Sequence, residues 1–246
     1  MTAFLPDKSQ SGTLAHIHVF APAAGTVLNL EWTRLLPPHV VVSNSRVPLA
    51  GGAAADLDAF VHAVKNDAPK SVSAKPSAIA VACALATAFR GSARENELLQ
   101  SLTETAGCPA VGMANSASTA LRALGARRVA ILTPYDATAN AWLRDYIAIA
   151  GFEPSKIGTI PGGPAAAGYL EPEDVARAAH ILLNSASNAD ALWIACGNVR
   201  TLEIIEELER LTGCAVVSSN LALLWACMRR CGIPGQMNGI GRLGTN

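Results

Sequence analysis

The sequence has few charged and aromatic side chains, and neither sign of charge is in excess. Only 15% of its 246 residues are charged, 5% are aromatic, and 19 Lys and Arg balance 19 Asp and Glu. Nucleic-acid recognition needs clustered basic side chains, so the sequence predicts no nucleic-acid partner. Half of the residues are hydrophobic, which excludes a disordered chain and predicts a substantial core.

Long apolar runs, metal-binding patterns and common catalytic motifs are also missing. No run reaches the roughly 20 residues that span a bilayer, and the first residues lack the order of a signal peptide, so we expect no membrane contact and a cytoplasmic location. The six cysteines form no Cys-x-x-Cys pair and are expected to be free thiols without zinc. No Gly-x-Gly-x-x-Gly, P-loop, His-Glu-x-x-His or Gly-x-Ser-x-Gly is present, so the chemistry must come from thiols, one tyrosine, an asparagine and backbone amides.

Two apolar runs each end in a cysteine. Residues 191–195 lead to Cys196, and residues 77–82 lead to Cys83. Apolar runs without alternation are typical of strands buried on both faces of a parallel sheet. Apolar residues at helical spacing follow each cysteine, and after Cys196 they begin at Thr201. Each cysteine is therefore expected where the carboxyl end of a strand meets a helix. Ligands bind at that edge of a parallel sheet.

The two segments continue alike. Each helix ends at a Gly-Cys pair, at Gly107 and Gly213, and a short apolar strand and a further helix follow. This βαβα repeat puts Cys83 and Cys196 at corresponding positions of two halves, facing one cleft. A free cysteine is often only a small buried hydrophobic residue, but the duplication favours a functional pair.

Strands and helices alternate through the rest of the chain. The sequence therefore predicts an α/β fold of two pseudo-symmetric doubly wound parallel-sheet halves with the active site between them. The first half is expected over residues 13–110, with residues 219–246 packing back on it, and the second half over residues 111–218. Further strands are expected at 14–20, 40–42, 128–133 and 156–160, helices at 27–36, 54–64, 140–150 and 171–185, loops at 43–52 and 67–75, and a flexible lid at 161–164.

Two further strand ends supply candidate binding residues. Pro22, Ala23 and Gly25 form a small-residue loop whose backbone N–H groups can approach a ligand closely. Tyr135 follows the corresponding strand of the second half and can direct its hydroxyl into the cleft. The alternative for Tyr135 is an aromatic at the sheet edge with its hydroxyl in water.

The segment from Cys196 to Glu203, together with residues 216–220 and Trp225, resembles the aspartate/glutamate racemase superfamily. Within it, the segment is similar to the branch that holds maleate cis-trans isomerase and arylmalonate decarboxylase. The resemblance extends from Phe20 to Leu243. It implies a small carboxylic-acid substrate and no metal or organic cofactor. It is compatible with either a monomer or a homo-oligomer.

Features of both enzymes occur. The presence of Cys83, Cys196 and Asn198 is similar to the isomerase, so the main prediction is a cofactor-independent, cysteine-dependent isomerase of a small carboxylic or dicarboxylic acid. In that reaction the resemblance implies addition of the Cys83 thiolate to the double bond and proton donation by Cys196. The loop at 22–25 is similar to the decarboxylase, in which Cys196 alone would donate a proton. An amino-acid racemase and a non-catalytic acid-binding protein are further alternatives.

One departure concerns the substrate. Ala84 and Leu85 stand where the resembled family places Thr-Ser, whose hydroxyls help to hold a carboxylate. A negative intermediate then needs the N–H groups of Ala84, Leu85, Gly197 and Asn198, together with the Tyr135 hydroxyl. The same strand-end N–H groups are expected to stabilise the thiolates.

Overall fold

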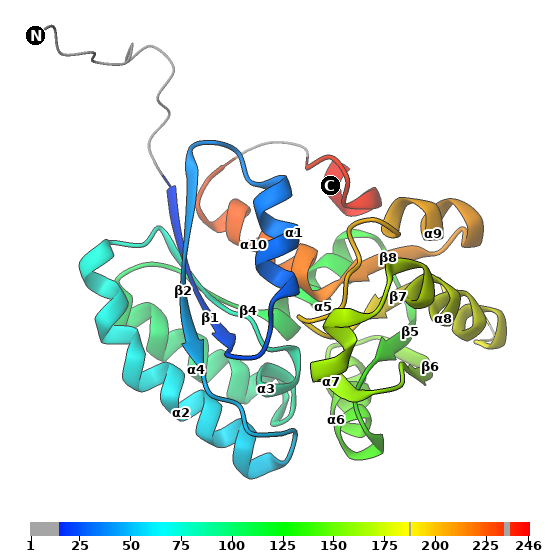
Figure 1. Ribbon diagram of the computed structural model, residues 1–246, viewed down its shortest axis with the longest axis horizontal. Coiled ribbons are helices and arrows are strands. Elements are labelled where there is room, and N and C mark those ends of the chain that lie inside the picture. Colours follow the sequence, from blue (N-terminus) through cyan, green and yellow to red (C-terminus); the bar gives the residue numbers. More distant parts are fainter. Residues whose placement is uncertain (1–14, 187, 234–236) are drawn as a thin grey trace, which may run out of the picture.

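Two four-stranded parallel sheets lie side by side in the computed structural model, which describes residues 15–186, 188–233 and 237–246 (Figure 1). The first sheet has the order β2-β1-β3-β4 and the second the order β6-β5-β7-β8, so each half repeats the same succession of strands. The predicted fold class is confirmed. The strands are β1 (Ala15–Pro22), β2 (Val40–Val47), β3 (Ala78–Val81), β4 (Ala110–Gly112), β5 (Arg128–Thr133), β6 (Glu153–Thr159), β7 (Ala191–Ile194) and β8 (Ala215–Ser218).

Helices cover both sheets. Those before the second sheet are α1 (Val27–Leu35), α2 (Ala54–Ser71), α3 (Ala84–Ala88), α4 (Gly91–Ala106) and α5 (Met113–Ala123). Those that follow are α6 (Ala137–Ile149), α7 (Gly163–Ala166), α8 (Pro172–Ser185), α9 (Ile205–Thr212) and α10 (Ser219–Arg230). Short 3-10 turns occupy η2 (Val72–Ala74), η3 (Ala167–Tyr169) and η4 (Gly241–Thr245). None of the helices described is long and apolar enough to cross a membrane.

The central strands position the two cysteines. Every residue of β3 and β7 is buried, as the unbroken apolar runs predict. Phe20, two residues before the end of β1, is in register with Val81 at the end of β3, so the segments after these strands are neighbours. Leu132 of β5 and Ile194 of β7 are paired in the same way. Cys83 and Cys196 therefore leave corresponding strands at the same edge of their sheets.

Helix α10 joins the halves. It packs against α1 and α5 and also contacts β3, β4 and β8. The Trp193 indole N–H of β7 donates to Ser219 Oγ at 3.0 Å, which holds the start of α10 on the second sheet. The turn η4 contacts α9 and β8 instead. How the chain divides into two domains stays a prediction.

Several expected boundaries were wrong. Strand β2 continues to Val47, because Ser43 and Ser45 bond to histidines of β1 rather than to solvent in a loop. Helix α2 continues to Ser71 and includes Pro69 in its last turns, so residues 67–71 are not a connector. Part of the expected lid forms α7. Leu14, expected in the first strand, lies outside the described residues.

Candidate active site

A cavity of about 330 Å³ lies where the carboxyl ends of the central strands of both halves meet. Cys83 follows β3, Cys196 follows β7, Pro22 ends β1, and Tyr135 follows β5, so each half contributes two strand ends. This is the position at which open parallel sheets bind ligands. The remaining lining residues are Ala24, Gly25, Leu28, Leu49, Ala50, Gly51, Gly52, Ala82, Ala84, Leu85, Pro164, Ala165, Gly197 and Asn198.

All but one of the candidate residues named from the sequence line this cavity. The exception is Ala23, which is exposed; its neighbour Ala24 takes the place at the wall. Sequence reasoning missed Leu28 and the segment 49–52. The segment follows β2, so the strand-end rule would have found it if the polar end of β2 had been recognised as strand. The contribution of each residue to substrate binding stays a prediction.

The Cys83 thiol is held against the first turn of α3. Cys83 occupies the N-cap position of α3 and is only 6% exposed. Burial raises the pKa of the thiol to about 12, although the N–H groups of Leu85 and Ala86 oppose the rise, and the charge of Cys196 adds to it. A thiol with this pKa is protonated at neutral pH.

The Cys196 thiol is held by a turn rather than by a helix end. The expected helix from Thr201 begins only at Ile205, and residues 197 to 204 form turns. The Asn198 N–H donates to Cys196 Sγ at 3.4 Å, and the nearby Tyr135 hydroxyl also acts to lower the pKa of this thiol. Burial nevertheless raises the pKa of this thiol. The expected N–H groups do lower the pKa of each thiol, but the cost of burying the charge exceeds their effect.

Tyr135 directs its hydroxyl into the cavity. Its residue is 8% exposed, and burial together with the two nearby sulfurs raises the pKa of the phenol. The backbone around it is fixed, because Tyr135 N–H donates to Thr133 Oγ1 at 3.1 Å and Asn140 Nδ2 donates to the Tyr135 carbonyl at 3.2 Å. The alternative of a hydroxyl in water is wrong. Tyr135 is a protonated, oriented donor.

The side chain of Asn198 joins two loops across the cavity. Its Oδ1 accepts from the N–H groups of Thr26 and Val27 at 3.1 and 3.4 Å, and its Nδ2 donates to the Pro164 carbonyl at 3.0 Å. A side chain with these partners has little capacity left for a substrate. The backbone N–H of Asn198 faces the Cys196 sulfur, so the residue contributes to the site through its main chain.

A buried carboxyl group, Glu31 of α1, fixes the segment after Cys196. It accepts from the N–H groups of Thr201 and Leu202 at 2.6 and 2.9 Å, from Thr201 Oγ1 at 2.9 Å and from Asn220 Nδ2 at 2.7 Å. Burial raises the pKa of Glu31, and these four donors oppose the rise. Sequence reasoning missed Glu31, since nothing local to α1 indicates partners about 170 residues away.

Charge is scarce around the cavity. No Lys, Arg or His is among its lining residues in the described part of the chain. Within the same residues, no group of three or more His, Cys, Asp or Glu side chains is arranged to hold a metal ion. The arrangement offers two neutral thiols, one phenol and backbone N–H groups in an apolar surround. Such a set can donate protons and stabilise a developing anion.

Comparison with known proteins shows the family to which this chain belongs. The arylmalonate decarboxylase family matches residues 18–244. The arylmalonate decarboxylase of Bordetella bronchiseptica is 27% identical over 95% of this chain and 98% of its own length. The maleate isomerase of Nocardia farcinica is 29% identical over 69% of this chain and 70% of its own length.

The fold agrees with that match. A mutant arylmalonate decarboxylase in liganded form superposes with a TM-score of 0.87 at 27% identity, covering 94% of this chain and 98% of the other. The shared fold and the matching residues extend over both halves and therefore include the cavity between them. The chain is thus an enzyme of the arylmalonate decarboxylase and maleate isomerase family, within the aspartate/glutamate racemase superfamily.

Proposed function

We propose that this enzyme is a decarboxylase of malonic acids that carry an apolar α-substituent, with Cys196 as the proton donor. The observation that supports this most is the pair of neutral thiols in an apolar cavity without cationic side chains. Sequence reasoning favoured the isomerase, but that reaction needs a Cys83 thiolate as nucleophile, and burial makes this thiolate costly. The fuller match to the Bordetella bronchiseptica decarboxylase also supports the alternative over the main prediction.

The reaction follows from the geometry. The side chains of Leu28, Leu49 and Leu85 form an apolar wall that suits an aryl or alkyl substituent. A carboxylate pressed against such a wall loses hydration, which favours its departure as carbon dioxide. The electron pair left on the α-carbon delocalises into the remaining carboxylate as an enediolate. The N–H groups at the start of α3 and at the start of the turn after β7 are then the donors for this anion.

Proton delivery completes the turnover. Cys196 transfers its Sγ proton to the α-carbon and becomes a thiolate. The Asn198 N–H, which already donates to this sulfur, and the nearby Tyr135 hydroxyl stabilise that thiolate until water restores the proton. A neutral cysteine is therefore the form that the reaction requires.

The second thiol supports one further candidate. Cys83 enters the same cavity from the other half, so protons can be removed and delivered by different sulfurs. This arrangement favours racemisation or isomerisation of an acid as a second activity. In a decarboxylase it also predicts a product protonated by both thiols rather than a single enantiomer.

The test is proton NMR in heavy water with phenylmalonate, methylphenylmalonate, aspartate and maleate, followed by chiral chromatography of the methylphenylmalonate product. We expect carbon dioxide loss from the malonates, loss of that activity in Cys196→Ala, and an enantiomerically enriched product from Cys83→Gly. The matched control is Cys108→Ala, a buried cysteine outside the cavity, which should behave as the wild type. Isomerisation of maleate without decarboxylation of either malonate would overturn the proposal.

A further inference from the structure

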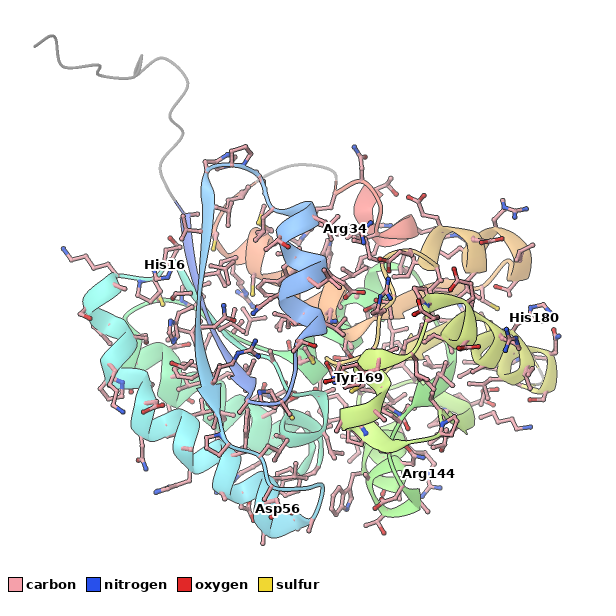
Figure 2. The ribbon with its side chains drawn as sticks, in the orientation of Figure 1. His16, Arg34, Asp56, Arg144, Tyr169 and His180 are labelled. Atoms are coloured by element: carbon pink, nitrogen blue, oxygen red, sulfur yellow. The ribbon has the colours of Figure 1, made fainter. Side chains whose placement is uncertain are left out.

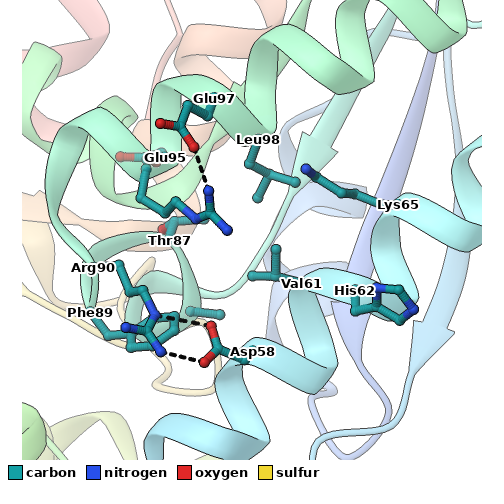
Figure 3. A pocket seen from close by; sticks show the side chains of 12 residues that line it. Asp58, Val61, His62, Lys65, Thr87, Phe89, Arg90, Glu95, Glu97 and Leu98 are labelled. Carbon is teal, nitrogen blue, oxygen red and sulfur yellow. Dashed lines mark hydrogen bonds and ion pairs between the residues drawn. The ribbon is translucent and has the colours of Figure 1, made fainter.

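A second cavity of about 630 Å³ lies between α2 and α4, with the end of α3 in its wall (Figure 3). No described residue lines both this cavity and the substrate cavity, so the two are separate spaces. Pockets that hold small ligands commonly have volumes of about 300–1,000 Å³. The second cavity is therefore large enough for a small organic molecule.

Two of the acidic side chains of this cavity are paired with arginines. Asp58 pairs with Arg90 and Glu97 pairs with Arg94, each at 2.5 Å. Figure 3 shows both pairs at the edge of the space between the helices. The negative charge of each carboxylate is thus already balanced by a neighbour.

The third acidic side chain is engaged on the far side of the wall. Glu95 accepts from the Asn115 N–H of α5 at 3.0 Å and from the Tyr146 hydroxyl of α6 at 2.5 Å. Neither of these partners lines the cavity. The acidic groups therefore give this cavity no preference for a cationic ligand.

Two basic side chains of α2 have no such balance. His62 and Lys65 line the cavity, and no ion pair within the described residues involves either of them. They are three residues apart and share one face of the helix, and Lys65 extends from α2 toward Leu98 of α4 (Figure 3). Arg94 adds positive charge from α4, because an exposed ion pair such as that with Glu97 is weak and can exchange its partner. The charge pattern favours an anion.

The inner wall of the cavity is apolar. Ala86 and Leu98 are 4% and 3% exposed, and the side chains of Val61 and Phe89 extend the same surface. The Phe89 ring is fixed by an edge-to-face contact with Trp142, with ring centroids 5.7 Å apart. An apolar group placed against this wall leaves water, which favours binding. A ligand that fits both parts has an anionic group and an apolar body.

Helix α3 connects this cavity to the substrate cavity. Ala84 and Leu85 line the substrate cavity, whereas Ala86 and Thr87 line the second cavity. The Thr87 hydroxyl donates to the Cys83 carbonyl at 3.0 Å. The segment that carries Cys83 is therefore held by a side chain in the wall of the second cavity.

Helix α2 gives a second connection. It begins at Ala54, two residues after the segment 49–52 that lines the substrate cavity. It also contacts α3 and α4. A ligand held between α2 and α4 therefore restrains two parts of the substrate-cavity wall.

We propose that the cavity between α2 and α4 binds a small organic anion, a carboxylate or a phosphate that carries an apolar group, through Lys65 and His62, and that its occupancy restrains the Cys83 segment. Within the described residues no thiol lines this cavity, so the ligand is an effector rather than a substrate. The inference goes beyond the proposed function and does not depend on which acid the enzyme turns over.

Binding is tested by adding phenyl phosphate or phenylacetate to the nitrogen-15-labelled enzyme at low ionic strength and following amide chemical shifts by NMR. We expect saturable shifts in residues 58–65 and 86–98 with one or both anions, and the comparison identifies the anionic group. Benzyl alcohol has the ring without the charge, and inorganic phosphate has the charge without the ring. Each should bind these residues about tenfold more weakly or less.

Variants of the two basic residues test their assignment. Lys65→Gln should weaken binding about tenfold, the effect of losing one charge-assisted hydrogen bond, and His62→Ala should weaken it as well. Lys70→Gln is the matched control, because Lys70 is on the same helix and outside the cavity. The inference is overturned by unchanged affinity in Lys65→Gln, or by the absence of shifts in residues 58–65 and 86–98 with both anions.

The connection to Cys83 is tested by its alkylation with iodoacetamide, followed by peptide mass spectrometry. Cys83 is 6% exposed, so the reagent reaches it only when the surrounding wall opens. A saturating anion should slow this reaction about threefold or more in the wild type and in Lys70→Gln, but not in Lys65→Gln. An unchanged rate in the wild type, or slowing that persists in Lys65→Gln, would overturn the connection. Because labelling needs no turnover, these results are independent of whether any malonate is decarboxylated.

Discussion

The two cysteines of the cavity differ from reactive surface thiols in the direction of their pKa shifts. Burial raises both values, to about 12 for Cys83. A thiol of this kind is a poor nucleophile at neutral pH but a suitable acid toward a carbanion-like centre, whose conjugate acid is far weaker still. The environment of each sulfur therefore supports the proposal of proton transfer rather than covalent addition.

In the proposed mechanism, the Tyr135 hydroxyl helps to stabilise the charge that develops on Cys196. Replacing Tyr135 with Phe removes this hydroxyl and keeps the ring. We expect turnover to fall by about tenfold to a thousandfold, as for the loss of one preorganised donor. Steady-state decarboxylation measured with the Tyr135→Phe variant checks this.

The control for that measurement is Tyr169→Phe. Tyr169 is 90% exposed and lies at the surface between the halves, on the turn after α7 (Figure 2). It should retain wild-type turnover. A Tyr135→Phe enzyme as active as this control would remove the hydroxyl from the mechanism.

At the scale of the elements, the side chain of Asn198 connects α7 to the loop after β1. Asn198→Ala removes the bonds to Thr26, Val27 and Pro164 at once. With each net hydrogen bond contributing about 1 kcal/mol, the loss of two or three should lower kcat/KM by about tenfold to a hundredfold. The effect should fall mainly on KM, since the Cys196 sulfur and the backbone N–H at position 198 remain.

Steady-state kinetics and limited proteolysis of the 160–170 segment test this expectation. Asn184→Ala, an exposed asparagine on α8, is the matched control and should change neither quantity. Unchanged kcat/KM together with unchanged proteolysis in Asn198→Ala would show that the two loops do not need the bridge.

The elements also show where sequence reasoning succeeds. Strands β3 and β7 were predictable because their apolar runs are buried on both faces, and the cysteines, Tyr135 and Pro22 followed from the strand-end rule. Helix α9 was predicted too early because residues 201–204 keep helical spacing. In the structure, the N–H groups of Thr201 and Leu202 bond to Glu31 instead of starting a helix. Partners that come from another half leave no local pattern.

At the scale of the whole molecule, two buried carboxyl groups tie the halves together. Glu95 reaches Tyr146 of the second half, and Glu31 reaches Thr201 and Asn220. Within the described residues neither group is paired with a cation; each accepts hydrogen bonds from several donors. Removing the carboxyl group while its donors stay buried is therefore costly.

Glu31→Ala and Glu31→Gln should differ strongly in stability. Alanine leaves the N–H groups of Thr201 and Leu202 and the Asn220 Nδ2 group without an acceptor, whereas the Thr201 hydroxyl can still donate to Ser218 Oγ. We expect a loss of about 2–4 kcal/mol in the free energy of unfolding. Glutamine keeps one oxygen for Thr201 and Leu202. Its amide group can pair with Asn220 after that side chain turns over, since Asn220 Oδ1 has no partner in the structure.

We expect Glu31→Gln to cost less than about 1 kcal/mol. Urea denaturation followed by circular dichroism measures both variants against Glu203→Gln, which changes a partly exposed carboxylate that pairs with Arg34 of α1. Equal losses in Glu31→Ala and Glu31→Gln would show that the negative charge, rather than the acceptor geometry, holds the halves together.

The position of α10 has a consequence for the growing polypeptide. Trp32 of α1 is 1% exposed, and its indole N–H donates to the Asn220 carbonyl at 2.9 Å. During translation, α1 and the sheet beneath it emerge long before residues 219–230 leave the ribosome. Until then the surface that α10 covers in the finished enzyme faces solvent or a chaperone. The core of the first half is thus completed only after the C-terminal helix α10 has been synthesised.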